Sequence, residues 1–309
     1  MDEFQLIRRY FAGLTPPAPG LVLGIGDDAA VLDWPAERQL VVSTDTLIAG
    51  RHFPEATSAY DVGWKALAVN LSDLAAMGAE PVAGLLALTL PAVSDDWLQD
   101  FARGFGGLAE RHGLCLIGGD LTRGPLSLTV TVIGAVPRGQ ALTRAGARPG
   151  DRVLVTGTLG DAALALRQGP GSPLRARLDR PEPRVAAGLA ARGRASAALD
   201  LSDGLAGDLR HVLAASGVGA CIEVDRLPAS SPFERQGLST AERRALQLAG
   251  GDDYELCLCV PPAQEAALRE ALAPLRLSAI GQITAEPGLR FVDGQGQPLD
   301  LPYEGYRHF

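Results

Sequence analysis

Aspartates beside glycine or hydroxyl residues recur in five short segments of this 309-residue chain. The segments cover residues 24–28, 43–45, 118–120, 200–204 and 250–253. Each follows an apolar run typical of a strand, so we expect these aspartates at strand ends, where α/β folds bind ligands. Mg²⁺ takes one or two carboxylates together with phosphate oxygens, and glycine lets a polyanion approach the backbone. A single aspartate could merely cap a turn, but five together predict a multi-metal phosphate site.

A further carboxylate is expected on a helix over residues 62–77. The apolar stripe of this helix has spacings of three, four and three and consists of Trp64, Leu67, Leu71 and Leu74. Asn70 and Asp73 lie three residues apart on a different face, beside small and apolar residues. Because an uncompensated buried carboxylate is costly, we interpret Asp73 as a metal ligand. The alternative is an exposed Asp73 on the solvent side of the helix.

Residues 24–29 also match the Gly-x-Gly-x-x-Ala pattern of dinucleotide-binding folds, with Asp45 about twenty residues later. Two details speak against that function. Pro35 follows too soon for the helix that the pattern requires, and Asp27 and Asp28 would repel a pyrophosphate unless metals intervened. The segment therefore favours a metal site over a dinucleotide site.

The charged residues exclude several classes of protein. The chain has 28 basic and 36 acidic side chains, a formal net charge of −8, and Lys65 is its single lysine. Lys65 lies between Trp64 and Ala66, so there is no Walker A loop, and the protein-kinase triplets are absent. The acidic balance argues against binding duplex nucleic acid. We expect a structural role for Lys65, with contact to ATP as the minority alternative.

The compartment is expected to be the cytoplasm. The chain starts with an acidic segment where a signal peptide would be basic. Its longest apolar stretch, residues 83–93, is interrupted by Thr89 and Pro91 and is too short to cross a membrane. The four cysteines lie in apolar, strand-like segments without Cys-x₂-Cys pairs, which indicates buried reduced thiols rather than a zinc site. They are Cys115, Cys221, Cys257 and Cys259.

Alternating strand and helix patterns predict an α/β protein with mixed sheets and two domains. The first half has expected strands over 21–25, 40–44, 84–90, 114–117 and 126–136, and helices over 4–12, 62–77 and 95–112. The second half has expected strands over 153–156, 198–201, 220–224 and 254–260, and helices over 161–167, 185–191, 204–216, 241–249 and 263–272. Residues 137–150 are poor in large apolar side chains, which predicts a junction between domains 1–138 and 149–309. Residues 169–184 are rich in proline, glycine and arginine, and we expect a mobile loop there.

Taken together, the motifs resemble the thiamine-monophosphate kinase family, a member of the aminoimidazole ribonucleotide synthetase-like superfamily. The matching segments occur in family order and cover residues 24–32, 43–53, 65–81, 116–127, 142–151, 200–205, 250–256 and 305–309. The resemblance implies a two-domain mixed-sheet fold and a homodimer that pairs through the N-terminal sheet. It also implies ATP-dependent phosphorylation of thiamine monophosphate to thiamine diphosphate, with several Mg²⁺ ions.

Carried over position by position, the resemblance implies three groups of site residues. Metal binding falls to Asp28, Ser43, Thr44, Asp45, Asp73, Asp120, Asp200 and Asp203. Contacts with ATP fall to Gly119, Asp120, Arg144 and Ser202. Contacts with thiamine monophosphate fall to His52, Asp252 and Tyr303. Asp252 stands where the family has glutamate, so its side chain has a shorter reach to the substrate. Tyr303 stands where tryptophan or another aromatic residue is usual.

The residue inventory fits direct in-line transfer between two phosphates, without a side-chain nucleophile or a strong base. Two alternatives remain open, a metal-dependent phosphatase using the same aspartates and a non-catalytic nucleotide or thiamine sensor. His52 could instead be a loop histidine bonded to backbone, and Arg144 could be a solvated linker charge. The expected partners are thiamine monophosphate, ATP and a second copy of the chain, with no nucleic acid and no membrane.

Overall fold

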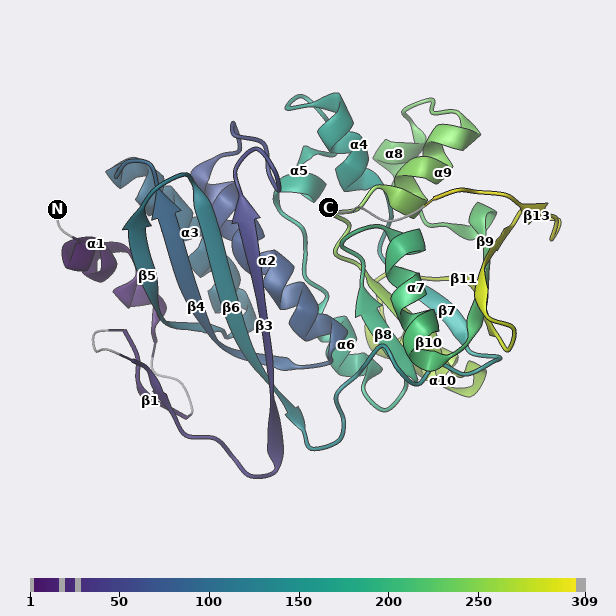
Figure 1. Cartoon of the computed structure of the whole chain (residues 1–309), viewed down its shortest axis with the longest axis horizontal. Helices are drawn as coiled ribbons and strands as arrows, with labels where there is room; N and C mark the ends of the chain where they lie inside the picture. Colours follow the sequence, from purple (N-terminus) through teal and green to yellow (C-terminus); the bar gives the residue numbers. More distant parts are fainter. Residues whose placement is uncertain (1–2, 17–19, 26–28, 304–309) are drawn as a thin grey trace. The chain divides into compact units, whose positions relative to one another are not determined.

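The computed structural model describes residues 3–16, 20–25 and 29–303. The chain divides into two compact units, residues 1–74 with 79–139 and residues 75–78 with 140–309. Each unit contains a larger sheet of its own (Figure 1). The break between residues 139 and 140 lies inside the junction expected over 137–150.

The first unit is built on a four-stranded sheet with the strand order β3-β6-β4-β5. Its strands are β3 (Arg38–Ile48), β4 (Glu80–Leu90), β5 (Cys115–Arg123) and β6 (Ser127–Pro137). β6 pairs antiparallel with β3 and β4, whereas β4 and β5 are parallel. This mixture of pairings confirms the expected mixed sheet.

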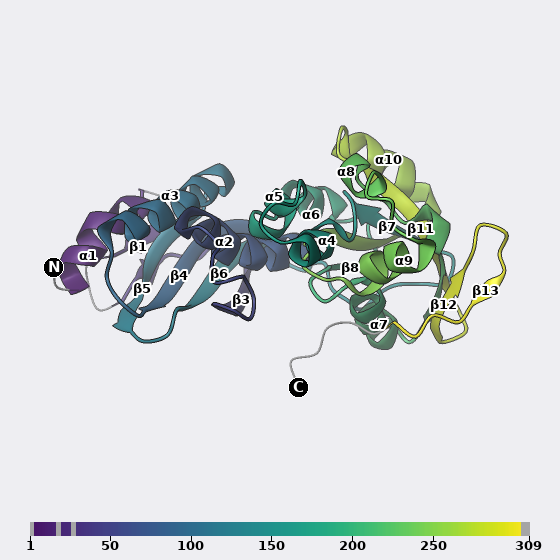
Figure 2. The same ribbon diagram turned by 90° about the horizontal axis from the view of Figure 1, so that it is seen from above.

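Two long helices, α2 (Ala59–Ala76) and α3 (Asp95–His112), cover one face of this sheet (Figure 1 and Figure 2). On β6 the buried residues Leu128, Val130 and Val132 alternate with half-buried ones, as expected for a strand with one covered face. The other face of the sheet has apolar side chains exposed on the neighbouring strand β3, where Leu40 is 50% exposed and Val42 is 60% exposed.

The local sequence explains the bounds of α3, which match the expected 95–112. The Ser94 hydroxyl accepts a hydrogen bond from the Trp97 amide, and Gly113 ends the helix in the left-handed conformation at φ 65°. The remaining described elements of this unit are α1 (Glu3–Tyr10), the 3₁₀ turn η1 (Ala12–Leu14), β1 (Leu21–Leu23) and β2 (Val31–Leu32). β1 and β2 pair with each other, and α1 and η1 contact β5.

The second unit is built on a seven-stranded sheet with the order β13-β12-β9-β11-β7-β10-β8. Its strands are β7 (Arg152–Thr156), β8 (Ala197–Asp200), β9 (Gly219–Glu223), β10 (Leu256–Val260), β11 (Leu277–Thr284), β12 (Gly288–Val292) and β13 (Pro298–Leu299). Every residue of β10 is buried, so this central strand is covered on both faces. Among the described strands of this unit, β9 and β12 are parallel and the other pairs are antiparallel.

Helices pack around this second sheet, with α7 against β8 and β12 and α6 against β10. The helices are α4 (Asp161–Gln168), α5 (Arg175–Asp179), α6 (Val185–Ala191), α7 (Leu205–Ser216), α8 (Ser231–Glu234), α9 (Thr240–Ala249) and α10 (Pro262–Leu272), with a 3₁₀ turn η2 (Val224–Arg226). The four cysteines are free; Cys115, Cys257 and Cys259 are buried, while Cys221 is only half-buried.

The expectation that most of residues 169–184 form a mobile loop does not hold for residues 174–179. This segment contains α5, and Leu174 and Leu178 are buried in a small apolar cluster with Phe233 and residues of α4. Local composition favoured a loop because proline, glycine and arginine dominate the segment. Burial of the two leucines outweighs that local preference.

The expectation that the aspartates stand at strand ends was wrong for two of them. Asp45 lies within the eleven residues of β3, and Asp120 lies within β5. Both strands extend beyond their apolar segments into polar residues such as Thr46 and Thr122. An apolar pattern therefore predicts strands that are too short. Asp200, by contrast, is the last residue of its strand, β8. Among the described residues, none of the helices has both the length and the apolar character needed to span a bilayer.

Candidate active site

The first unit brings together Ser43, Asp45 and Asp73. Ser43 and Asp45 alternate with Thr44 along β3 and share one face of the sheet. The Ser43 hydroxyl donates a hydrogen bond of 2.5 Å to Asp73 Oδ2 on α2. Asp73 is half-buried, so the alternative of a fully solvent-exposed carboxylate does not hold. The result is a group of oxygen ligands of the kind that a hard cation prefers.

Asn70 fixes the backbone beside this group. Its side chain is completely buried, and its Oδ1 accepts a hydrogen bond of 3.0 Å from the amide of Asp45. Its Nδ2 donates to the carbonyl of Ala66 one turn earlier, at 2.9 Å. Since both polar groups of the amide are engaged, Asn70 holds α2 and β3 in register at Asp45.

The side chain of Thr44 lies on the opposite face of β3. Its hydroxyl donates to the carbonyl of Val130 at 3.1 Å and accepts from the hydroxyl of Thr131 at 3.0 Å. The structure therefore does not place this hydroxyl with Ser43 and Asp45. A metal contact at Thr44 would have to use its main-chain oxygen. Asp28, the other predicted metal ligand near the start of the chain, lies outside the described residues.

Gly119 and Asp120 border a cavity of about 870 Å³ in the first unit. The cavity is mainly apolar and is lined by residues of β4 and β5, such as Leu86, by residues of α1 and by Phe11, which follows α1. A side chain at position 119 would collide with the carbonyl of Leu86, so glycine is required there. The volume lies in the range of ligand pockets, about 300–1,000 Å³.

His52 has a defined protonation pattern. Its Nδ1 accepts a hydrogen bond of 3.0 Å from the amide of Ile48, so in the neutral ring the proton resides on Nε2. The turn that holds the ring is closed by bonds from Gly50 to the carbonyl of Phe53, 2.8 Å, and from the His52 amide to the carbonyl of Ile48, 3.0 Å. The backbone contact named as an alternative therefore exists, and it orients Nε2–H as a donor.

The second unit gathers Ser202, Asp203 and Asp252 next to the end of β8, where Asp200 lies. The amide of Asp252 donates to the carbonyl of Ser202 at 2.8 Å, and the amide of Tyr254 donates to the carbonyl of Leu201 at 2.8 Å. These two bonds hold the 200–204 and 251–254 segments side by side. The two segments thus act as one structural element.

Asp252 and Tyr254 adopt an unusual backbone conformation. Their φ angles are 58° and 47°, in the left-handed region that residues other than glycine rarely adopt. Such conformations cost on the order of 1–3 kcal/mol each and persist where the surrounding structure enforces them. Strained conformations of this kind cluster at active sites and ligand clamps, so the 252–254 turn is a candidate part of the site.

Arg144 and Tyr303 belong to the second unit but not to this pair of segments. The Arg144 side chain is exposed, and the main-chain carbonyl of Arg144 accepts a hydrogen bond from the Ser216 hydroxyl at 3.0 Å. The Tyr303 ring is half-buried against the core of the unit, and its hydroxyl donates to the carbonyl of Ala241 at 3.4 Å. The structure brings neither of them into contact with Asp200, Asp203 or Asp252.

Comparison with known proteins identifies the family. Residues 26–136 match the AIR synthase related protein N-terminal domain, and residues 148–294 match the corresponding C-terminal domain. The thiamine-monophosphate kinase of Escherichia coli is 46% identical over 320 residues, which cover 99% of this chain and 98% of the relative. The chain belongs to the thiamine-monophosphate kinase family.

Two solved structures of thiamine-monophosphate kinase type share the fold. The enzyme of Stenotrophomonas maltophilia is 48% identical with a TM-score of 0.87, covering 97% of this chain and 98% of that chain. The structure of AaThiL complexed with AMPPCP and TMP is 31% identical with a TM-score of 0.77, covering 92% of each chain. These matches confirm the predicted family and the two-domain fold.

Sequence reasoning missed the role of Asp208. Its carboxylate accepts hydrogen bonds from the amides of Asp203 at 3.0 Å and Gly204 at 3.1 Å, so it supports the loop that carries a predicted metal ligand. Burial, and then the neighbouring charge of Asp203, raise the pKa of Asp208 to about 7. The signal in the sequence was an aspartate four residues after Gly204, at the start of a helix.

Asp253 has a different position from the neighbouring Asp252. It is 3% exposed, and its Oδ1 accepts from the amide of Gly160 at 2.8 Å. Burial raises the pKa of this carboxyl well above its ordinary value. The side chain thus supports the start of α4, whereas the sequence grouped it with the metal-site aspartates.

The residues present fit magnesium in a thiamine-monophosphate kinase. Within residues 3–16, 20–25 and 29–303, no three His, Cys, Asp or Glu side chains converge on one point. Among the described residues, the predicted carboxylate ligands are instead divided between the units, with Asp45, Asp73 and Asp120 in the first and Asp200 and Asp203 in the second. Mg²⁺ is usually held by one or two carboxylates and completes its shell with water and substrate phosphates.

Proposed function

We propose that this protein phosphorylates thiamine monophosphate to thiamine diphosphate with ATP as phosphoryl donor. The observation that carries the proposal is 46% identity to a thiamine-monophosphate kinase over 99% of the chain. A structural relative, 31% identical, is known in complex with AMPPCP and TMP. AMPPCP is a non-hydrolysable analogue of ATP, which supports ATP as the co-substrate.

The two substrates are assigned to different residues. We assign ATP to Gly119, Asp120, Arg144 and Ser202, and thiamine monophosphate to His52, Asp252 and Tyr303. The cavity beside Gly119 and Asp120 has the size and apolar lining suited to a nucleotide base. We assign the Nε2–H of His52 as a donor to a phosphate oxygen, which the bond from the Ile48 amide to Nδ1 supports, and the flat ring of Tyr303 suits stacking on a heterocycle.

Magnesium is assigned to Asp28, Ser43, Thr44, Asp45, Asp73, Asp120, Asp200 and Asp203. When bound, Mg²⁺ supplies positive charge that offsets the repulsion between the two phosphates. The acceptor phosphate is already anionic near neutral pH, so the chain needs neither a strong base nor a side-chain nucleophile. The proposed contribution of the protein's own residues is to bind and orient the acceptor and donor phosphates.

The assembly and the compartment are part of the same proposal. Leu40, Val42 and Ile48 are 50%, 60% and 43% exposed on the uncovered face of the first sheet, with Thr44 and Thr46 between Val42 and Ile48, and we call these three apolar residues the apolar strip of β3. We assign this strip to pairing with a second copy of the chain, because large exposed apolar patches mark interaction sites. Four free cysteines suit the reducing cytoplasm.

The decisive experiment is incubation with ATP, Mg²⁺ and thiamine monophosphate, followed by chromatography. The proposal predicts equal amounts of thiamine diphosphate and ADP, and neither product when Mg²⁺ is removed with a chelator. Release of inorganic phosphate from thiamine monophosphate without ATP would identify a phosphatase instead. Binding of both ligands without any product would identify a sensor.

A further inference from the structure

Glu255 is a completely buried carboxylate immediately before β10, three residues after Asp252. Both of its oxygens are engaged by arginines. Arg184 donates through Nε to Oε2 at 2.6 Å and through a terminal nitrogen to Oε1 at 2.6 Å, and Arg177 donates to Oε1 at 2.8 Å. The hydroxyl of Thr156 adds a bond of 2.7 Å to Oε2. Bidentate pairing of this kind fixes the carboxylate in position and orientation.

The main chain of Glu255 joins the two segments of the candidate site. Its carbonyl accepts from the amide of Leu201 at 2.8 Å, and the preceding amide, of Tyr254, donates to the carbonyl of Leu201 at 2.8 Å. Asp252 bonds to Ser202 in the same ladder. A fixed Glu255 therefore sets where the 252–254 turn ends relative to the 200–204 loop.

We call the fixed carboxylate of Glu255 the Glu255 anchor. The 252–254 turn depends on this anchor more than the 200–204 loop does. Asp252 and Tyr254 are held at positive φ, which needs an enforcing environment. The loop has a support of its own in the carboxylate of Asp208, which binds the amides of Asp203 and Gly204. Loss of the Glu255 anchor should therefore displace Asp252 more than Asp203.

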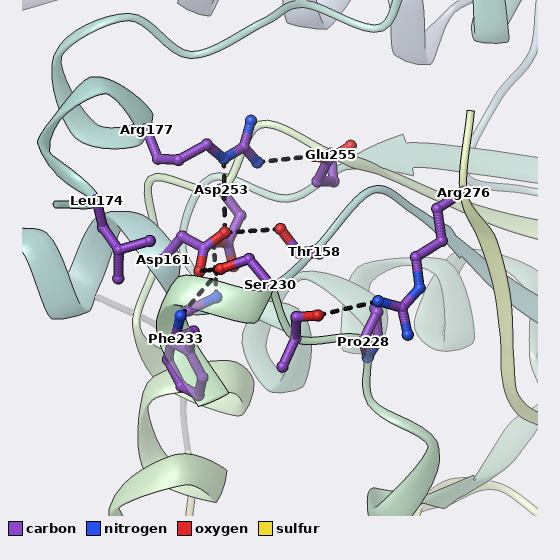
Figure 3. Close-up of polar contacts among 12 residues, drawn as sticks. Thr158, Asp161, Leu174, Arg177, Pro228, Ser230, Phe233, Asp253, Glu255 and Arg276 are labelled. Atoms are coloured by element: carbon purple, nitrogen blue, oxygen red, sulfur yellow. Dashed lines mark hydrogen bonds and ion pairs between the residues drawn. The ribbon is translucent and has the colours of Figure 1, made fainter. Parts of the chain in front are cut away.

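The anchor reaches across several elements of the second unit. Figure 3 shows Arg177 of α5 between Asp161 and Glu255, with Nε of Arg177 lying 3.7 Å from Asp161 Oδ2. Arg184 immediately precedes α6, and a side chain at Gly157, after β7, would collide with the carboxylate of Glu255. The segment expected to be a mobile loop is thus the source of the two cations that hold Glu255.

We propose that Glu255 is a positioning residue that, held by Arg177 and Arg184, keeps Asp252 in the conformation that receives thiamine monophosphate. The inference rests on the proposed role of Asp252 as a substrate contact. Glu255 is fully buried, so it acts on the substrate through the turn and not by direct contact.

The test is a double-mutant cycle on the intact enzyme. Glu255→Gln keeps the shape of the side chain and removes its charge, and it should raise KM for thiamine monophosphate about tenfold while KM for ATP changes less than about twofold. Asp252→Asn should raise the same KM, and the double variant should resemble Asp252→Asn because both changes act through one contact. The matched control is Glu265→Gln, which removes an ion pair with Arg269 on α10 and should change neither KM.

Arg177→Lys provides a second route if Glu255→Gln folds poorly, because the Arg177 side chain is 25% exposed. Lysine keeps the charge but cannot fork between Asp161 and Glu255, so KM for thiamine monophosphate should rise about threefold. The proposal is overturned if either folded variant raises both KM values equally, if neither variant raises KM for thiamine monophosphate, or if the effects in the cycle are additive. A wild-type protein that makes no thiamine diphosphate would instead overturn the proposed function, so the two failures are distinguishable.

Discussion

The candidate ligands of the first unit (Ser43, Asp45 and Asp73) are called the first half-site, and those of the second unit (Asp203 and Asp252) the second half-site. The two groups use aspartate in different ways. In the first unit, Ser43, Asp45 and Asp73 project from a regular strand and a regular helix, and the carboxylates themselves form the site. In the second unit, Asp203 and Asp252 lie on irregular segments, and buried acids behind them, Asp208 and Glu255, hold the backbone. Similar Asp-rich motifs in the sequence therefore combine ligands with supports.

Backbone regularity explains this difference. The ladder of β3 and β6 fixes every position of β3, so Asp45 needs only the extra bond from its amide to Asn70. The 252–254 turn has non-glycine residues at positive φ and lacks such a ladder on its own, so it needs buried acceptors and arginines nearby. Substitutions in the first half-site should thus affect chemistry, and those behind the second should affect geometry and stability.

The largest effect is expected for Asp73→Asn in the first half-site. The amide keeps the shape and can still accept from Ser43, so the thermal midpoint should stay close to wild type. Loss of the charge removes a proposed metal ligand, and kcat should fall by at least about a hundredfold. Steady-state assays across Mg²⁺ concentrations measure this. Asp100→Asn, which breaks an exposed ion pair with Arg103 on α3, is the control and should retain full activity. Wild-type rates in Asp73→Asn would remove the first half-site from the mechanism.

The sheets of the two units offer a second contrast, since β10 is covered on both faces and β3 on only one. Val42→Asp places a charge in the apolar strip of β3 and should convert the proposed dimer to monomers, because an unpaired charge in an apolar interface is costly. Sedimentation velocity gives the oligomeric state directly. Val93→Asp changes a residue with similar exposure, 54%, in the segment before α3, and should leave the assembly intact. A Val42→Asp dimer would mean that the strip serves another purpose.

A further prediction concerns His52, the proposed contact with thiamine monophosphate in the first unit. Removing its Nε2–H with His52→Ala should raise KM for thiamine monophosphate about tenfold, the value of one hydrogen bond to a charged group. His52→Gln should recover part of the loss because its amide nitrogen can occupy the place of Nε2. KM for ATP should remain unchanged in both variants. Equal KM values for alanine, glutamine and wild type would show that His52 does not contact the substrate.

The sequence was sufficient where local signals determine structure. Ser94 and Gly113 predicted both ends of α3, and the alternation of apolar residues predicted most strands of the two sheets. It failed for α5, whose helix depends on burial of Leu174 and Leu178 against distant residues. Glu255 was missed for the same reason, because its arginine partners lie 71 and 78 residues away along the chain.

The support of the second half-site should also produce a pH effect on stability. Burial and the charge of Asp203 raise the pKa of Asp208 to about 7, above its value in the unfolded chain. The folded protein therefore binds this proton more tightly, so the contribution to stability is complete below about pH 4 and is lost as the pH rises through about 7. Urea unfolding without metal should show that the free energy of unfolding decreases by about 2–4 kcal/mol between pH 4 and 8, and this decrease should be missing in Asp208→Asn.

Asp225→Asn is a control with the opposite pH dependence. Hydrogen bonds from Gly294 and Arg244 lower the pKa of Asp225, so its contribution to stability is lost only as the pH falls. Identical pH profiles for wild type and Asp208→Asn would show that this carboxylate is not held in the environment that the structure gives it.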